Sequence, residues 1–195
     1  MISLEQEIKN YLSSRSIPFV DNSDSYDKLD FTIGDKPGKV YHIDAKEKRQ
    51  RYNPASWGIH PHTEPYAMII DDLAHSKIVG QSPRSGIIVR DNVRGGYYWY
   101  NVLDLCKIEK TRANRAICRN GVTYYKGKII LDLRHALCSD TLHGAFDYIR
   151  AYERNRKYYF TKHHECYGKY FGEVIPTLGQ TRKPEHWNED ILATR

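Results

Sequence analysis

The sequence predicts an α/β protein with a central mixed β-sheet flanked by helices. Three observations predict this class: an amphipathic segment at the N-terminus, two alternating segments joined by a turn over 29–46, and a helical segment followed by an apolar strand over 63–90. Helices and strands in this order are typical of a sheet with helices on both faces. The 195 residues contain no repeat, linker or low-complexity tract, so we interpret 1–195 as one domain.

Each helix and strand predicted in the first half of the chain follows from a short-range sequence pattern. A helix is expected to begin after Ser3, because Ser3 and Gln6 form a capping box ahead of apolar residues at helical spacing. Residues 29–33 and 40–46 alternate as strands do, with a turn between them over 35–38. A helix is predicted over 63–80 and a buried strand over 86–90. The apolar stripe of the second helix comprises Ala67, Ile70, Leu73, Ala74 and Ile78.

The second half is predicted to be rich in strands. Residues 97–103 form an aromatic strand after two glycines, and 128–133 form another strand. The sequence Arg119-Asn120-Gly121-Val122 predicts a tight hairpin turn, because both central residues tolerate positive φ. A last helix is expected over 141–156, and the tail beyond 172 lacks periodicity.

Composition excludes some classes of protein. No stretch approaches the ~20 apolar residues of a membrane-spanning helix, so we expect no membrane partner. The N-terminus carries acids where a secretory signal has a basic region and an apolar core, which predicts a cytoplasmic, reducing location. Thirty Lys and Arg against 24 Asp and Glu give a net charge of +6, a modest excess that favours an anionic partner.

The four cysteines lie far apart without a CxxC pair, so free thiols are expected. Two HxxC half-sites, which by ligand type could hold zinc, are the exception. Nine histidines produce such pairs by chance, and zinc is therefore the less favoured reading of these four residues: His135, Cys138, His163 and Cys166.

The segment that carries chemistry contains two carboxylates and a lysine. Alternate side chains of a strand share a face, so Asp44 and Lys46 project together and Ala45 points the other way. Asp30, on the preceding strand of the hairpin, is expected to lie beside them. Two carboxylates supply the oxygen ligands that Mg²⁺ prefers, and a lysine can orient a bound water. This combination predicts metal-assisted phosphodiester hydrolysis, whereas a solvated strand face is the alternative.

Glu5, Asp30 and the tripeptide Asp44-Ala45-Lys46 resemble, in identity, order and spacing, the motif of the PD-(D/E)XK nuclease superfamily. The resemblance covers residues 1 to about 90, and Leu29 stands where the family usually has proline. It implies a restriction-endonuclease-like core over 1–90, with a strand-rich extension and a C-terminal helix over 91–195. It also implies Mg²⁺ or Mn²⁺ held by Asp30, Asp44, the Ala45 carbonyl and Glu5, with Lys46 positioning the nucleophilic water.

Basic and aromatic residues around this motif predict nucleic-acid contacts, although such runs are often only solvated surface. One group follows the motif directly and a second lies in the strand-rich half. The candidates are Lys48, Arg49, Arg51, Tyr52, Arg112 and Arg115.

The expected function is a metal-dependent endonuclease that cuts DNA, leaving 5′-phosphate and 3′-hydroxyl ends as the resemblance implies. Two alternatives stay open: a nuclease of the same fold specific for RNA or for branched junctions, and a non-catalytic nucleic-acid-binding subunit. A double-strand break needs two active centres, so a homodimer, or a place as the nuclease subunit of a larger complex, is expected.

Overall fold

The computed structural model describes residues 2–36 and 38–166, apart from the side chains at 119 and 156–166. The chain divides into two compact units, Met1–Ala151 and Tyr152–Arg195. The two sheets, the core and the site described below belong to the first unit, and α5 begins in it and continues into the second. The single domain expected over 1–195 stays a prediction, because most of the second unit lies outside the described residues.

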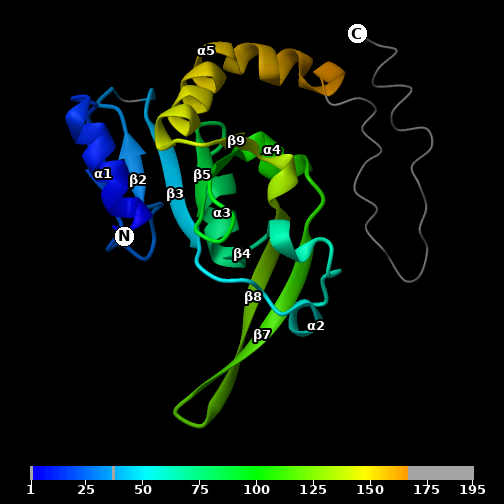
Figure 1. Ribbon diagram of the computed structural model, residues 1–195. Coiled ribbons are helices and arrows are strands. Elements are labelled where there is room, and N and C mark those ends of the chain that lie inside the picture. Colours follow the sequence, from blue (N-terminus) through cyan, green and yellow to red (C-terminus); the bar gives the residue numbers. More distant parts are fainter. Residues whose placement is uncertain (1, 37, 167–195) are drawn as a thin grey trace. The chain divides into compact units, whose positions relative to one another are not determined.

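A six-stranded sheet forms the centre of the first unit (Figure 1). Its order is β1 (Phe19–Asp21), β2 (Phe31–Ile33), β3 (Tyr41–Lys48), β5 (Ser85–Asp91), β6 (Tyr97–Asn101) and β9 (Leu137–Ser139). Strands β3 and β5 run parallel and the other neighbours are antiparallel. The sheet is therefore mixed, and helices flank it as predicted.

A second, antiparallel sheet contains β4 (Ala67–Asp71), β8 (Val122–Asp132) and β7 (Thr111–Arg119), with β8 in the middle. The helices of the first unit are α1 (Leu4–Ser14), α2 (Pro54–Trp57), α3 (Asp72–Gly80), α4 (Val102–Lys107) and the first part of α5 (Leu142–Cys166). Two short 3₁₀ turns, η1 (Glu64–Tyr66) and η2 (Leu133–His135), complete the set.

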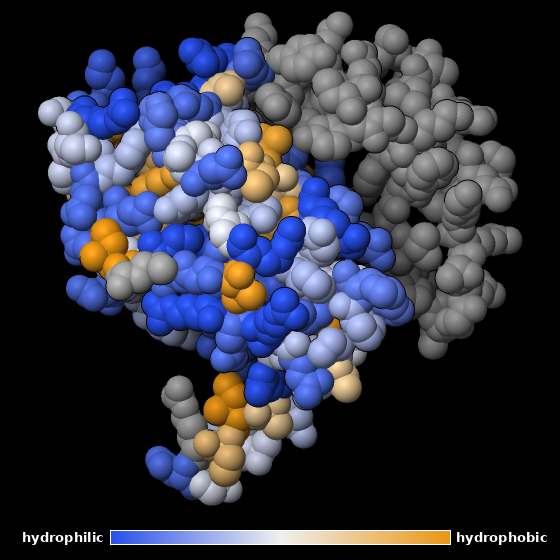
Figure 2. Space-filling model, in the orientation of Figure 1, coloured by the Kyte–Doolittle hydropathy of each residue, from blue (hydrophilic) through white to orange (hydrophobic). Residues whose placement is uncertain are grey.

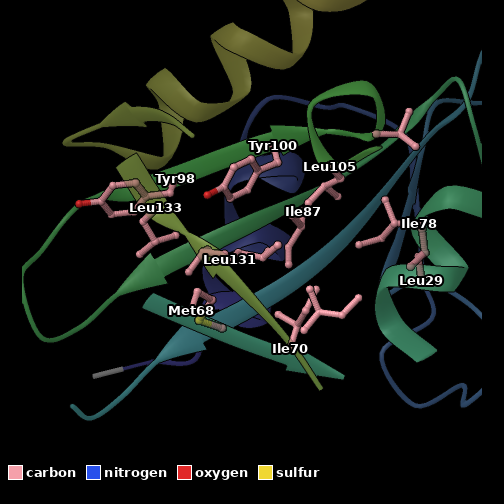
Figure 3. Packing of buried hydrophobic residues seen from close by; sticks show 13 residues of the cluster. Leu29, Met68, Ile70, Ile78, Ile87, Tyr98, Tyr100, Leu105, Leu131 and Leu133 are labelled. Carbon is pink, nitrogen blue, oxygen red and sulfur yellow. The ribbon is translucent and has the colours of Figure 1, made fainter. Parts of the chain in front are cut away.

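The main core lies between one face of the large sheet and the small sheet with α3 and α4 (Figure 3). Ile87 and Tyr100 project into it from β5 and β6, and Met68 and Leu131 come from the small sheet. Leu29 belongs to the same cluster and is 3% exposed. Burial of Leu29 fixes the chain immediately before Asp30, which ties the position of a candidate site residue to the core.

Helix α1 packs on the opposite face of the large sheet. Its buried stripe comprises Leu4, Ile8 and Leu12, and the Ser3 hydroxyl accepts a hydrogen bond from the Gln6 N–H, as the capping box predicts. A polar network fastens the first turn to the sheet, because Arg90 forms ion pairs with Glu7 and Glu47, and the Leu4 N–H also bonds to Glu47. The face opposite to α1 is therefore the one on which Asp44 and Lys46 lie.

The helix predicted over 63–80 is wrong in its first half. Residues 64–66 form η1 and 67–71 form β4, so the helix begins only at Asp72. A short apolar run is compatible with a buried strand or a buried helix, and pairing with β8 about sixty residues later decides it. Leu73, assigned to the buried stripe, is 44% exposed.

Smaller differences concern the ends of strands. Leu29 and Asp30 precede β2 instead of belonging to it, and β3 extends to Lys48. The strand predicted over 97–103 ends at Asn101, whose side chain accepts a hydrogen bond from the Asp104 N–H and caps α4. The hairpin turn at 119–122 and the helix from about 141 are confirmed.

Cys106, Cys118 and Cys138 are free and exposed, as expected. No helix within the described part of the chain combines the length and the hydrophobicity needed to cross a membrane.

Candidate metal centre

The β2–β3 hairpin brings the predicted carboxylates together. Phe31 pairs with Ile43 and Thr32 with His42, so Asp30 stands one register position beyond the ladder, opposite Asp44. The Asp30 Oδ2 accepts a hydrogen bond of 2.7 Å from the Ala45 N–H, which locks this carboxylate against β3. Asp30, Asp44 and Lys46 thus share one site, as the alternation of the two strands predicts.

The Lys46 ammonium occupies the point where three oxygen atoms converge. Its Nζ lies 2.8 Å from the Asp44 Oδ2, 3.4 Å from the Asp30 Oδ2 and 3.1 Å from the Ala45 carbonyl oxygen. These are three of the four oxygen sources that the sequence analysis assigned to a metal ion. The ammonium therefore sits where a cation is stabilised, and a divalent ion would have to displace it.

Burial sets the electrostatics of this site. The Asp44 side chain is 5% exposed, and desolvation raises its pKa to about 6, while the Lys46 charge opposes the rise and the Asp30 charge adds to it. For Lys46, desolvation lowers the pKa, but Asp44 and Asp30 together outweigh it and the pKa is raised. At neutral pH the site therefore holds an ionised but poorly solvated Asp44 beside a firmly protonated lysine.

The oxygen atoms of the site are of the kind that coordinates a divalent cation. The Asp44 Oδ2 is buried, and no group in the described ranges donates to it with hydrogen-bond geometry, although the Lys46 ammonium is in ion-pair range. A buried carboxylate oxygen whose close partner is a single ammonium is incompletely solvated, and coordination of Mg²⁺ or Mn²⁺ would offset the cost of its burial. The oxygens of Asp30, Asp44 and the Ala45 carbonyl are the ones that would hold the ion.

Glu5 is not brought into this group. It lies on α1, across the sheet from Asp44, and among the described side chains no three His, Cys, Asp or Glu residues gather as a metal-holding cluster. The resemblance implies a ligand role for Glu5; no contact of the described residues joins Glu5 to Asp30, Asp44 or Lys46, and that role stays a prediction. Its neighbour Glu7 is engaged with Arg90 and Tyr97 in the polar network that anchors α1.

Two residues near the site were missed from the sequence. The Lys77 ammonium of α3 donates to the carbonyls of Tyr26 and Lys28, just before Asp30, and its charge lowers the pKa of Asp44. His42 lies on the Asp44 face of β3, 3.1 Å from the Thr32 hydroxyl, and burial lowers its pKa. The alternation of β3 could have found His42, but no local pattern links Lys77 to a segment about fifty residues earlier.

Two of the predicted nucleic-acid contacts are turned into the protein. Lys48 is fully buried and donates to the carbonyls of Glu64 and Pro65, so its assignment to phosphate binding is wrong. Tyr52 is half-buried, and its hydroxyl receives a hydrogen bond from the Ile69 N–H. Because β3 continues to Lys48, its even-numbered side chains keep facing the core, which the predicted strand end at 46 did not anticipate.

The other basic candidates lie on the surface. Arg49 pairs with Glu47, and Arg51 is exposed. Arg112 and Arg115 lie on β7, where Arg115 stacks over the Trp57 ring at 4.8 Å. The four arginines are accessible to an anionic ligand, and their role in binding stays a prediction.

The second proposed metal site is only partly described. His135 lies in η2 and Cys138 in β9, both exposed. The side chains of His163 and Cys166 lie outside the described residues, so the zinc alternative stays a prediction.

The converging oxygens lead to a prediction about Lys46. Replacing it by methionine, which keeps the length of the side chain without its charge, should tighten Mn²⁺ binding about tenfold at pH 8, because the competing ammonium is removed. Calorimetric titration with Mn²⁺ in the absence of nucleic acid measures this. Lys9→Met is the control, since Lys9 forms an exposed ion pair with Asp21. Equal or weaker Mn²⁺ binding by Lys46→Met would contradict the assignment.

Comparison with known proteins identifies no relative. No model of a known protein family matches the chain, and no curated protein matches it at a significant level. The functional argument therefore depends on the geometry of this site.

Proposed function

We propose that this protein is a metal-dependent endonuclease that hydrolyses phosphodiester bonds of DNA. The observation that carries the proposal is the convergence of Asp30, Asp44 and the Ala45 carbonyl on one cationic position, held at present by Lys46. A buried carboxylate beside a lysine contributes little in a merely structural role, because the cost of removing both charges from water offsets much of their attraction. Such arrangements are typical of functional sites.

The residues divide the chemistry between them. A divalent ion bound there would polarise the phosphate and lower the pKa of its water. Asp44 and Asp30 supply the negative charge that holds the ion, and the Asp30 contact with the Ala45 N–H fixes the spacing of the two carboxylates. With a metal ion held by the carboxylates, the Lys46 ammonium would be available beside them to orient a water molecule and to offset negative charge on the phosphate.

We also propose that the core has the restriction-endonuclease-like fold. Support comes from the order of its elements: α1, the hairpin of β2 and β3, then α3 and the parallel strand β5. The carboxylates lie on the hairpin and the lysine follows two residues after Asp44, as the resemblance implies. In this proposal the strands β6 to β9 and the helix α5, in the described part of 91–195, would be the elaboration of that core.

The test is cleavage by the full chain. Supercoiled plasmid should be nicked or linearised in the presence of Mg²⁺ or Mn²⁺, should stay intact with EDTA, and should be cut again when excess metal is restored. Duplex DNA, a four-way junction, single-stranded DNA and RNA, compared at equal concentration, separate the substrate classes. Absence of metal-dependent cleavage on all four substrates would refute the proposal.

A non-catalytic nucleic-acid-binding subunit is the second candidate. It is favoured by the two-carboxylate composition of the site, because the described residues bring no third acid to the metal position. Salt-sensitive binding of DNA without cleavage of any of the four substrates, together with no detectable binding of Mn²⁺, would select this function.

A further inference from the structure

The hairpin of β7 and β8 extends beyond the body of the first unit (Figures 1 and 2). Strand β8 pairs with β4 only from Lys128 to Asp132, so the part of the hairpin nearer the turn is a ribbon of two strands. Six residues on each strand give this ribbon a length of about 20 Å. Asn120 and Gly121, with φ of 51° and 74°, close it in a turn that suits two twisted strands.

The hairpin that carries this ribbon is basic and has no internal counter-charge. Between Lys110 and Leu131 the sequence contains no Asp or Glu, whereas it contains these Lys and Arg residues: Lys110, Arg112, Arg115, Arg119, Lys126 and Lys128. The nearest acids belong to the body of the unit, where Asp71 pairs with Lys126 and Lys128, and Asp72 lies 3.7 Å from Arg112. Arg115 contacts the Trp57 ring and forms no ion pair with any described residue. The ribbon therefore keeps an excess of positive charge.

The register distributes these groups over both faces of the ribbon. Arg115 is paired with Lys126, so the two cations share one face, and Arg112 lies on the other because it is three residues away from Arg115. Tyr124 and Tyr125 are adjacent, so they also point to opposite faces, with exposures of 54% and 76%. Within the ribbon the cations therefore lie on the face of Arg115 and Lys126, whereas Arg112 lies at the base, where β8 still pairs with β4; each face presents an exposed phenol toward the tip.

We propose that the β7–β8 ribbon is an arm that enters the major groove of duplex DNA. The proposal rests on the proposed function in its choice of DNA as the polyanion. A two-stranded ribbon fits the major groove, which is about 12 Å wide; Arg115 and Lys126 on one face, with Arg112 at the base, then meet phosphates of the groove walls. The exposed tyrosines near the tip reach the base edges, where an apolar ring with a hydroxyl can make contacts of both kinds.

Helix α3 connects the arm to the metal centre. Asp72, in its first turn, lies close to Arg112 and Gly127 at the base of the ribbon, whereas Lys77 lies beside the segment that leads to Asp30. Five helical residues correspond to a rise of about 7.5 Å. One short helix therefore joins the base of the arm to the segment that leads to Asp30, so the arm and the Asp44 site belong to neighbouring parts of the same unit.

The test compares two double variants, one that removes two positive charges from one face of the arm and one that removes two positive charges elsewhere on the protein. The arm variant is Arg115→Gln with Lys126→Gln, which loses a cation–π contact and an ion pair. The control is Arg15→Gln with Lys9→Gln on α1, across the large sheet from Asp44, which loses the same two kinds of contact, with Tyr11 and Asp21. Circular dichroism and thermal unfolding establish that both variants are folded.

Binding to a labelled duplex of about 30 base pairs, in EDTA so that nothing is cut, is measured by fluorescence anisotropy over a range of salt. The arm variant should bind about tenfold more weakly than wild type, and its slope of log K against log salt should fall by about 2, while the control changes neither. Dimethyl sulfate footprinting identifies the groove that is occupied, because the reagent methylates guanine N7 in the major groove. The wild-type protein should protect guanine N7 from methylation. The double variant Tyr124→Ser with Tyr125→Ser should not.

The outcomes separate this inference from the proposed function. If wild type cuts DNA and the arm variant binds like the control, the arm proposal fails and the nuclease proposal stands. If wild type never cuts but the arm variant loses affinity, the reverse holds. If light scattering shows that the two Tyr→Ser changes dissociate a dimer while DNA binding and footprint are unchanged, the arm is a protein interface and the proposal is overturned.

Discussion

Replacing Asp44 by asparagine is expected to reduce metal-dependent cleavage at least about 10³-fold while the protein stays folded. The amide keeps the volume of the side chain but removes the charge, and it presents an N–H group toward the position that a cation must occupy. The Asp44 side chain is 5% exposed and packs beside the core, so a substitution of equal size should preserve the structure. Initial rates of plasmid nicking in Mg²⁺ give the ratio.

Asp27→Asn is the matched control for this prediction. Asp27 lies three residues before Asp30, is exposed, and accepts a hydrogen bond from the Ser25 hydroxyl, outside the converging oxygens. It should cut DNA at the wild-type rate. Asp44→Asn should also bind duplex DNA in EDTA about as well as wild type, because the loss concerns the metal centre. Cleavage by Asp44→Asn at the wild-type rate would refute the assignment of the site.

The pH dependence of stability should differ between wild type and the same Asp44→Asn variant by about 3 kcal/mol between pH 4 and pH 8 in EDTA. Burial raises the pKa of Asp44 from 3.8 to about 6, so the folded protein binds a proton more tightly than the unfolded chain does. This contribution to stability is fully present below about pH 4 and is lost as the pH rises through about 6. The asparagine has no such titration, so its relative stability rises over this interval.

Urea unfolding at several pH values gives the free energy of unfolding of each protein. Subtracting one pH profile from the other cancels the titration of the groups that both proteins share. A divalent ion should favour ionised Asp44, so Mg²⁺ should stabilise wild type more at pH 7.5 than at pH 5 and should leave Asp44→Asn nearly unaffected. Parallel pH profiles for the two proteins would mean that Asp44 has an ordinary pKa and that its burial does not strain the ionised form.

Local pattern alone located much of the site. A strand alternates its side chains with period two, so Asp44 and Lys46 had to share a face, and the turn over 35–38 had to bring Asp30 beside them. The same kind of reasoning found the Ser3 cap and the Asn120-Gly121 hairpin turn, which depend on neighbours within three or four residues. Interactions of short range leave a signature in the sequence.

The predictions that the structure contradicts failed because they depend on contacts between residues far apart in the sequence. Residues 67–71 became a strand because β8 pairs with them, and Lys48 became a buried donor because β3 extends past the motif toward η1. The resemblance implies Glu5 as a ligand, but α1 lies on the face of the sheet opposite to Asp44. None of these outcomes is encoded in a window of a few residues.

The sequence by itself therefore determined which side chains of the hairpin could meet, and that a cation of some kind belongs among them. Only the tertiary structure decided which cation is there: the Lys46 ammonium lies among the oxygens of Asp30, Asp44 and Ala45. It also decided that Lys77 approaches from α3 and that the basic hairpin starts near the other end of that helix. The reason is physical, since periodicity fixes faces, while packing between distant segments fixes distances and burial.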